Sequence, residues 1–182
     1  VLFGATGFTG GLTADYLARN APAELRWAIA GRSLDKLTEV RDRIAREVPA
    51  CADLALVEAD AADAQALAGL AARTRVVIST VGPYLNFGEP LVAACAEAGT
   101  DYVDLTGEPE FVDRMWLKYN KQAQESGARI VNCCGFDSIP HDLGAWFTVQ
   151  HLPEGVGNAV EAATVDDAGA TFLGLLVVLE PH

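Results

Sequence analysis

A glycine-rich loop near the start of the chain constrains the fold more than any other segment. It reads Gly-Ala-Thr-Gly-Phe-Thr-Gly from Gly4 to Gly10, directly after the apolar residues 1–3 and directly before an amphipathic segment. Glycines in such a loop let the backbone turn tightly, approach a pyrophosphate and pack a helix close to a strand. A plain tight turn can carry the same glycines, so the segments that follow decide between the two interpretations.

Short β-branched runs alternate with amphipathic segments over residues 1–132. This alternation predicts an α/β fold of the Rossmann type, a doubly wound parallel sheet with helices on both faces. In that context the glycine loop is typical of a dinucleotide site, where the first helix directs its unpaired N–H groups and positive dipole end at phosphates. The predicted strands are Val1–Phe3, Arg26–Ala30, Leu54–Val57, Arg75–Thr80, Asp101–Leu105 and Arg129–Asn132.

Three helices have clear signals at their ends. The first opens on a serine in the N-cap position and repeats apolar residues every three or four positions. The other two open on a proline and stop at a glycine. Their predicted ranges are Ser33–Val48, Pro90–Ala98 and Pro109–Ser126.

The pattern changes after residue 132. A loop over residues 133–140 leads into a predicted helix from Pro140 to about Gln150, with Asp137 or Ser138 as its cap. Residues 153–158 have the composition of a linker.

Residues 159–182 hold one strand candidate, Val160–Val165, and one apolar run, Leu175–Leu179, which is too little for a second core. We therefore expect a dinucleotide-binding Rossmann domain over residues 1–152. Residues 153–182 are expected to be a linker and the truncated start of a second α/β domain for substrate or dimerisation.

Charge and cysteine content exclude several classes of partner. With 13 Lys+Arg against 25 Asp+Glu the formal net charge is -12, and a polyphosphate backbone would repel such a chain, so we expect no nucleic acid partner. The four cysteines form no CxxC pair and have no histidine at ligand spacing, so neither a disulfide framework nor a metal site is indicated. A reduced, cytoplasmic setting is the resulting expectation. No apolar run approaches the ~20 residues of an integral membrane segment.

The end of the second predicted strand bears on the choice between NAD and NADP. An acidic residue at this point would bind a ribose 2′-hydroxyl, whereas an arginine accommodates a 2′-phosphate. The sequence here is Ala30-Gly31-Arg32-Ser33, without a carboxylate, so we expect NADP (NADPH) as the cofactor. Arg32 can form a fork to the phosphate and Ser33 can add a hydroxyl. A solvated arginine at a strand end is the alternative.

Further candidates follow the third and fourth predicted strands. Asp60 is a candidate acceptor for the adenine amine, or equally a helix cap or surface acid. Val81-Gly82-Pro83-Tyr84 would lie against the ribose and nicotinamide, with Tyr84 pointing into the cleft, unless the segment is an ordinary turn. The predicted cofactor contacts are Gly4, Thr6, Gly7, Phe8, Thr9, Gly10, Arg32, Ser33, Asp60, Val81, Gly82, Pro83 and Tyr84.

Catalytic residues are poorly indicated. No tyrosine is followed four positions later by lysine, and no Gly-x-Ser-x-Gly elbow is present. The remaining candidates are Tyr84, Asp137 and Ser138, the last two at the end of the sixth predicted strand. A helix cap explains Asp137 and Ser138 equally well. Asp104, Thr106, Gly107 and Glu108, after the fifth predicted strand, are open to the same two interpretations.

Six segments together resemble the saccharopine dehydrogenase-like (saccharopine reductase-type) oxidoreductases. They are Gly4–Gly10, Ala30–Ser33, Ser79–Tyr84, Gly88–Ala98, Gly99–Glu108 and Cys134–Gly144. Within this family the sequences of these segments are most similar to the trans-acting enoyl reductase branch. The resemblance implies NADPH-dependent hydride transfer to an unsaturated acyl chain held by a polyketide synthase. It also implies that Gly4, Gly7 and Gly10 contact the pyrophosphate and that Arg32 contacts the adenosine phosphate.

The resemblance covers residues 1–152 and fails beyond them. Family members carry a second α/β domain, inserted after the position of Gly144, that roofs the active site and often makes a homodimer; residues 153–182 do not resemble it. His141 stands where relatives often have small residues, so the resemblance does not support a catalytic role for it. A small-molecule or carrier-bound acyl substrate is thus expected. Two alternatives remain: imine reduction of an amino-acid adduct, and a non-catalytic NADP(H) sensor.

Overall fold

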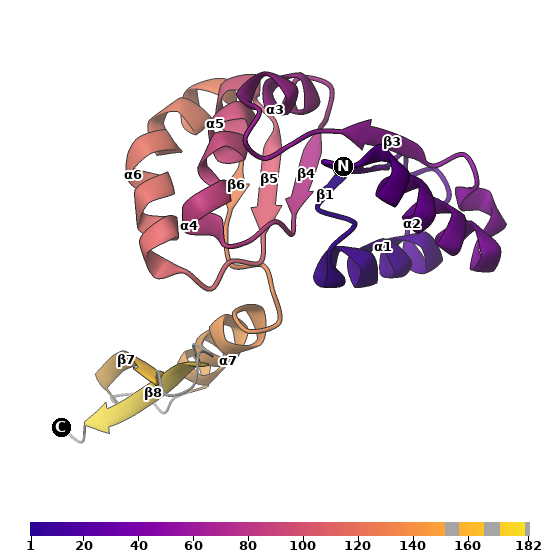
Figure 1. Ribbon diagram of the computed structural model, residues 1–182. Coiled ribbons are helices and arrows are strands. Elements are labelled where there is room, and N and C mark those ends of the chain that lie inside the picture. The colour runs from indigo at the N-terminus through magenta and orange to yellow at the C-terminus, as the bar shows by residue number, and fades with distance from the viewer. Residues whose placement is uncertain (152–156, 166–171, 181–182) are drawn as a thin grey trace. The chain divides into compact units, whose positions relative to one another are not determined.

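Figure 1 shows the computed structural model, which describes residues 1–151, 157–165 and 172–180 of the chain. By its internal contacts the chain divides into two compact units, Val1–Asn132 and Cys133–His182. Residues 153–156 of the predicted linker lie outside the described residues.

The first unit contains a six-stranded parallel sheet with the order β3-β2-β1-β4-β5-β6. Every predicted strand is present, within two residues of its predicted bounds. This order places β1 in the interior of the sheet and reverses direction beside it, which confirms the doubly wound Rossmann fold. The strands are β1 Leu2–Phe3, β2 Ala28–Gly31, β3 Ala55–Glu58, β4 Val76–Ser79, β5 Asp101–Asp104 and β6 Ile130–Val131.

The helices of this unit end where the sequence signals lie. Ser33 is the N-cap of α2, and its Oγ accepts a hydrogen bond from the N–H of Lys36 at 3.4 Å. Gly99 and Gly127 follow α5 and α6 with φ of 71° and 82°, a left-handed conformation that glycine adopts without strain. The helices are α1 Phe8–Asn20, α2 Leu34–Glu47, α3 Ala64–Ala71, α4 Tyr84–Phe87, α5 Glu89–Ala98 and α6 Pro109–Ser126, with a 3-10 turn at Pro49–Cys51.

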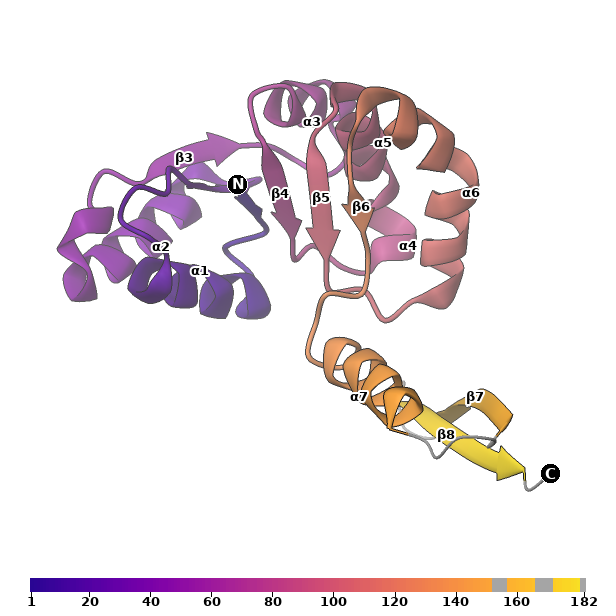
Figure 2. The same ribbon diagram turned by 180° about the vertical axis from the view of Figure 1, so that it is seen from behind.

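Two hydrophobic clusters lie on opposite faces of the sheet, so helices cover both faces, α1 and α2 on one and α3, α5 and α6 on the other (Figures 1 and 2). Consecutive strand residues alternate between the clusters, because side chains of a strand point to opposite faces. Leu2 and Ile29 pack with Ala14, Leu37 and Ile44 of α1 and α2. Phe3, Ala30, Val77 and Tyr102 pack with Leu67, Leu91, Phe111 and Met115.

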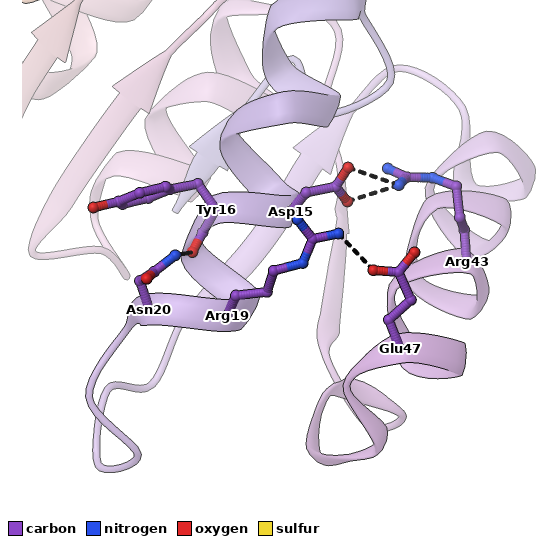
Figure 3. Close-up of polar contacts among 6 residues, drawn as sticks. All are labelled: Asp15, Tyr16, Arg19, Asn20, Arg43 and Glu47. Carbon is purple, nitrogen blue, oxygen red and sulfur yellow. Dashed lines mark hydrogen bonds and ion pairs between the residues drawn. The ribbon is translucent and has the colours of Figure 1, made fainter.

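Two ion pairs tie α1 to α2 (Figure 3). Asp15 accepts from one Arg43 nitrogen with both carboxylate oxygens, at 2.7 and 2.8 Å, and one turn further along Arg19 pairs with Glu47. Tyr16 points away from this contact. The pairs help to fix the helix that carries the glycine loop.

A double-mutant cycle on Asp15 and Arg43 is expected to give a small coupling. Both side chains keep part of their surface in water, 21% for Asp15 and 41% for Arg43, so the coupling should be about 0.5–1 kcal/mol and should shrink in high salt. Urea denaturation of D15A, R43A and the double variant measures it. A coupling of zero at low salt would contradict the bond in Figure 3.

The second unit contains helix α7, Ile139–Gln150, and an antiparallel pair of strands, β7 Gly157–Val165 and β8 Phe172–Glu180. The predicted helix is confirmed, and Ser138 is its N-cap residue, although no side-chain hydrogen bond caps it. The predicted strand and the apolar run correspond to β7 and β8. Helix α7 therefore groups with residues 133–182, whereas the prediction of a domain over residues 1–152 included it. No helix within residues 1–151 has the length and apolar character needed to cross a bilayer.

Candidate dinucleotide site

Each glycine of the loop meets a different physical requirement. Gly4 has φ +94°, and a Cβ there would lie 2.7 Å from both Thr80 Oγ1 and Val81 Cγ2. A Cβ on Gly10 would lie 2.1 Å from the carbonyl oxygen of Gly4. At Gly7 a Cβ would meet only the Gly4 oxygen, at 3.4 Å. The loop therefore needs a tight turn at Gly4 and close helix packing at Gly10, and it leaves the backbone at Gly7 open to a ligand.

The first turn of α1 carries N–H groups without intrahelical acceptors. The helix begins at Phe8, its N-cap is Gly7, and no side chain caps it. The Gly7 N–H donates to the Gly4 oxygen at 3.0 Å, and the Gly11 N–H donates to the Gly7 oxygen at 2.8 Å. The N–H groups of Phe8 and Thr9, which lie between them, stay available. Thr6, Gly7, Phe8 and Thr9 are exposed. Such a helix start suits an anion, and the open backbone at Gly7 suits a diphosphate.

The carboxyl ends of β1, β2 and β4 meet at this loop. A Cβ on Gly31, the last residue of β2, would lie 3.8 Å from Thr6 Oγ1, and one on Gly4 would touch Thr80 and Val81, which follow β4. Ligands of doubly wound sheets bind at this reversal of strand order. The fold thus brings together three predicted parts of the site: the glycine loop, the segment that begins at Arg32, and Val81–Pro83.

Arg32 has the exposure that a phosphate contact requires. It is exposed and has no hydrogen bond or ion pair within the part of the chain that the structure describes. Ser33 beside it is half-buried, with its oxygen on the N–H of Lys36. A guanidinium in this position can bind the 2′-phosphate of NADP bidentately.

Asp60 makes a local turn. It is exposed, and its Oδ1 accepts from the N–H of Ala62 at 2.9 Å. The N-cap of α3 is Asp63, which accepts from the N–H groups of Gln65 and Ala66, so the helix-cap alternative for Asp60 is not what the structure shows. Its contact with adenine stays a prediction.

The side chain of Tyr84 lies in the core, which corrects the prediction that it points into the cleft. It is 4% exposed, its hydroxyl donates to the backbone oxygen of Ser79 at 3.0 Å, and its ring packs on Phe111. Burial raises the pKa of its hydroxyl far above the ordinary value. A phenol held in this way cannot donate a proton to a substrate, so Tyr84 is removed from the catalytic candidates.

Val81, Gly82 and Pro83 form the exposed side of the same segment. Val81 is half-buried, and Gly82 and Pro83 are exposed. Thr80, which the sequence argument overlooked, fixes their start, because its Oγ1 donates to the backbone oxygen of Phe3 at 3.0 Å and lies beside Gly4 and Gly10. A hydroxyl directly after a central strand is the signal that would have identified it.

Asp104 belongs to a buried network at the end of β5. It is 2% exposed and accepts from the Tyr102 hydroxyl at 2.9 Å, from the Thr106 N–H at 3.1 Å and from Asn132 Nδ2 at 2.7 Å. Burial, together with the Asp104 charge, raises the pKa of Tyr102. These contacts make Asp104 a brace between β5 and β6.

The remaining candidates lie in the second unit or outside the site. Asp137 is exposed and Ser138 is half-buried at the start of α7; their roles toward a substrate stay predictions.

No group of three or more metal-ligating side chains occurs among the described residues. A hollow of about 950 Å³ lined by Val1, Trp27 and Arg75 lies at the opposite, amino edge of the sheet and is separate from the dinucleotide site.

Comparison with known proteins agrees with this geometry. Residues 1–131 match the family described as the saccharopine dehydrogenase NADP binding domain. A Mycobacterium tuberculosis protein provisionally named trans-acting enoyl reductase is 51% identical over 186 residues, 98% of this chain and 43% of the relative. The trans-acting enoyl reductase of Mycobacterium ulcerans is 48% identical over 166 residues, 91% of this chain and 39% of its own length. The chain thus spans less than half of these relatives.

Two solved structures share the fold. Apo saccharopine dehydrogenase (L-Glu forming) from Saccharomyces cerevisiae has a TM-score of 0.64 at 21% identity, over 82% of this chain and 30% of that one. The triphenylmethane reductase of a Citrobacter species, complexed with NADP(H), has a TM-score of 0.52 at 16% identity, over 72% of this chain and 47% of that one. The glycine loop, the exposed Arg32 and the match over residues 1–131 lead to one conclusion: the chain belongs to the saccharopine dehydrogenase NADP-binding domain family, and NADP is its cofactor.

Proposed function

We propose that the chain is the cofactor-binding part of an NADPH-dependent enoyl reductase that acts on an α,β-unsaturated acyl group. The observation that carries the proposal is the opening at Gly7, where the backbone is free of side chains and the first turn of α1 has N–H groups to spare. The names of relatives at about half identity over nearly the whole chain support the substrate class.

The roles of the site residues follow from their positions. The N–H groups of Phe8 and Thr9 would hold the pyrophosphate, and Arg32 with Ser33 would hold the 2′-phosphate. Val81–Pro83 would support the ribose and nicotinamide. When bound, NADPH supplies a hydride for the unsaturated carbon. The chain's own contribution is orientation, because holding two reactants in line removes much of the entropic barrier.

Several finer points belong to this proposal. The acyl group would be a small thioester or be held on a carrier protein, and a second domain would cover the reaction and make a homodimer. The cytoplasmic setting expected from the cysteines is also a prediction. Asp137 and Ser138 remain the candidate side chains toward the substrate.

The full-length protein is expected to oxidise NADPH when an enoyl thioester is added, and to oxidise NADPH faster than NADH. The test follows the loss of nicotinamide absorbance together with formation of the saturated thioester. Turnover with a keto acid and an amino acid, but not with the thioester, would instead favour imine reduction. Tight NADPH binding without turnover of any acceptor would favour a sensor. Absence of NADPH binding would overturn the proposal.

A further inference from the structure

The carboxylate of Glu108 caps a helix that lies 24 residues earlier in the chain. One oxygen accepts from the N–H of Tyr84 and the other from the N–H of Leu85, both at 2.8 Å. These two residues open α4, the four-residue helix that follows Val81–Pro83. Glu108 is also the N-cap residue of α6, yet its side chain makes no bond to that helix. Its carboxylate is thus committed to α4.

Helix α4 has no cap from its own sequence. Its N-cap residue is Pro83, which makes no side-chain hydrogen bond, and the first N–H groups of any helix lack intrahelical acceptors. Two charge-assisted bonds from one carboxylate satisfy the first two of them. The end of the Val81–Pro83 segment is therefore fixed by Glu108.

Glu108 is itself held from the sheet. Its N–H donates to Thr106 Oγ1 at 3.1 Å, and Thr106 is 1% exposed. The N–H of Thr106 donates in turn to Asp104, which also accepts from Tyr102 and Asn132. A continuous line of hydrogen bonds therefore runs from β5 to the start of α4.

The other contacts of α4 leave it little freedom. The Tyr84 ring centroid lies 5.6 Å from that of Phe111. A Cβ on Gly88, directly after α4, would come within 2.6 Å of the Phe111 ring, so the backbone there packs directly on that ring. At the other end of the segment Thr80 bonds to the Phe3 oxygen. Val81–Pro83 is anchored at both ends, and its Glu108 anchor is a polar side chain at the carboxyl edge of the sheet.

We infer that Glu108 is a positioning residue for the nicotinamide half of the cofactor, acting through α4 on Val81–Pro83. This inference rests on the proposed function, since it assigns that segment to the nicotinamide. Both carboxylate oxygens of Glu108 are bonded to α4, so its effect on the cofactor would pass through that helix. Its removal should therefore affect the nicotinamide end and leave the adenosine end, held at Arg32, unchanged.

Calorimetric titration of the full chain with two ligands tests the inference. NADPH spans the whole site, whereas adenosine 2′,5′-bisphosphate lacks the nicotinamide. In E108A the dissociation constant for NADPH should rise about tenfold, and that for the bisphosphate less than about twofold, since the two charged hydrogen bonds no longer hold the segment. E108Q, which keeps one acceptor oxygen, should fall between wild type and E108A for NADPH.

Glu110 offers a matched control, because it is an exposed acid in the first turn of α6; E110A should bind both ligands as wild type does. Equal weakening of both ligands in E108A would mean a general loss of structure and overturn the inference, as would unchanged NADPH binding. If E108A does not fold, E108Q decides by the same comparison, and unfolding of both would make Glu108 a stability residue only. Failure of wild type to bind either ligand would refute the proposed function instead.

Discussion

Replacing Arg32 by alanine is expected to weaken NADPH binding about a hundredfold while changing NADH binding by less than about twofold, because a bidentate guanidinium–phosphate contact is worth two or three kcal/mol. NADH lacks the 2′-phosphate, so it loses nothing when the guanidinium is removed. The sequence Ala30–Ser33 offers no carboxylate that would favour a free ribose 2′-hydroxyl in its place.

The exposure of Arg32 makes this large effect reasonable. No ion pair within the described residues competes for its guanidinium, so the phosphate would be its partner and no internal bond must break first. Fluorescence titration with both cofactors measures the two dissociation constants. High salt should reduce the preference, because the contact is between exposed charges.

Arg26 supplies the matched control for Arg32. It is also exposed, precedes β2 rather than following it, and lines the hollow at the amino edge of the sheet. R26A removes the same charge and should leave both dissociation constants unchanged. Equal losses of NADPH and NADH in R32A would show that Arg32 supports the fold and does not select the cofactor.

The fold was predictable because its signals are local. Strands buried on both faces read as continuous apolar runs, and β2 is buried along its whole length as that rule requires. Ser33, Gly99 and Gly127 mark helix ends through their own side chains or their own φ. The glycine loop was predictable for the same reason, since atoms of nearby residues require glycine at Gly4 and Gly10.

The position of Tyr84 was not predictable, because long-range contacts determine it. A tyrosine after Gly82-Pro83 has the local pattern of an exposed turn residue. Its burial depends on Phe111, which follows β5 in the chain, and on the oxygen of Ser79. Helix α4 depends on Glu108 in the same way. No spacing within residues 79–88 carries that information.

Replacing Gly10 by alanine is expected to destabilise the fold by more than about 3 kcal/mol, beyond the usual range for overpacking, and to abolish NADPH binding. The new methyl group would lie 2.1 Å from the backbone oxygen of Gly4 and 2.8 Å from Thr80 Oγ1. A backbone atom cannot rotate away as a flexible side chain can, so either α1 moves out from β1 or the loop opens. In both cases the N–H groups at the start of α1 leave their places around the diphosphate.

Gly11, the next residue, provides the control, because its replacement by alanine should increase the stability of the fold and not decrease it. A Cβ there would lie 3.8 Å from Arg43 Nη2 and 3.9 Å from the Ala5 oxygen, which are ordinary contacts. Alanine is the better helix former, so G11A should be more stable than wild type by about 0.5–1 kcal/mol. Urea denaturation followed by circular dichroism measures both variants. If G10A were as stable as G11A, the close contact between α1 and β1 would not exist, and the glycine loop would lose its geometric basis as a diphosphate site.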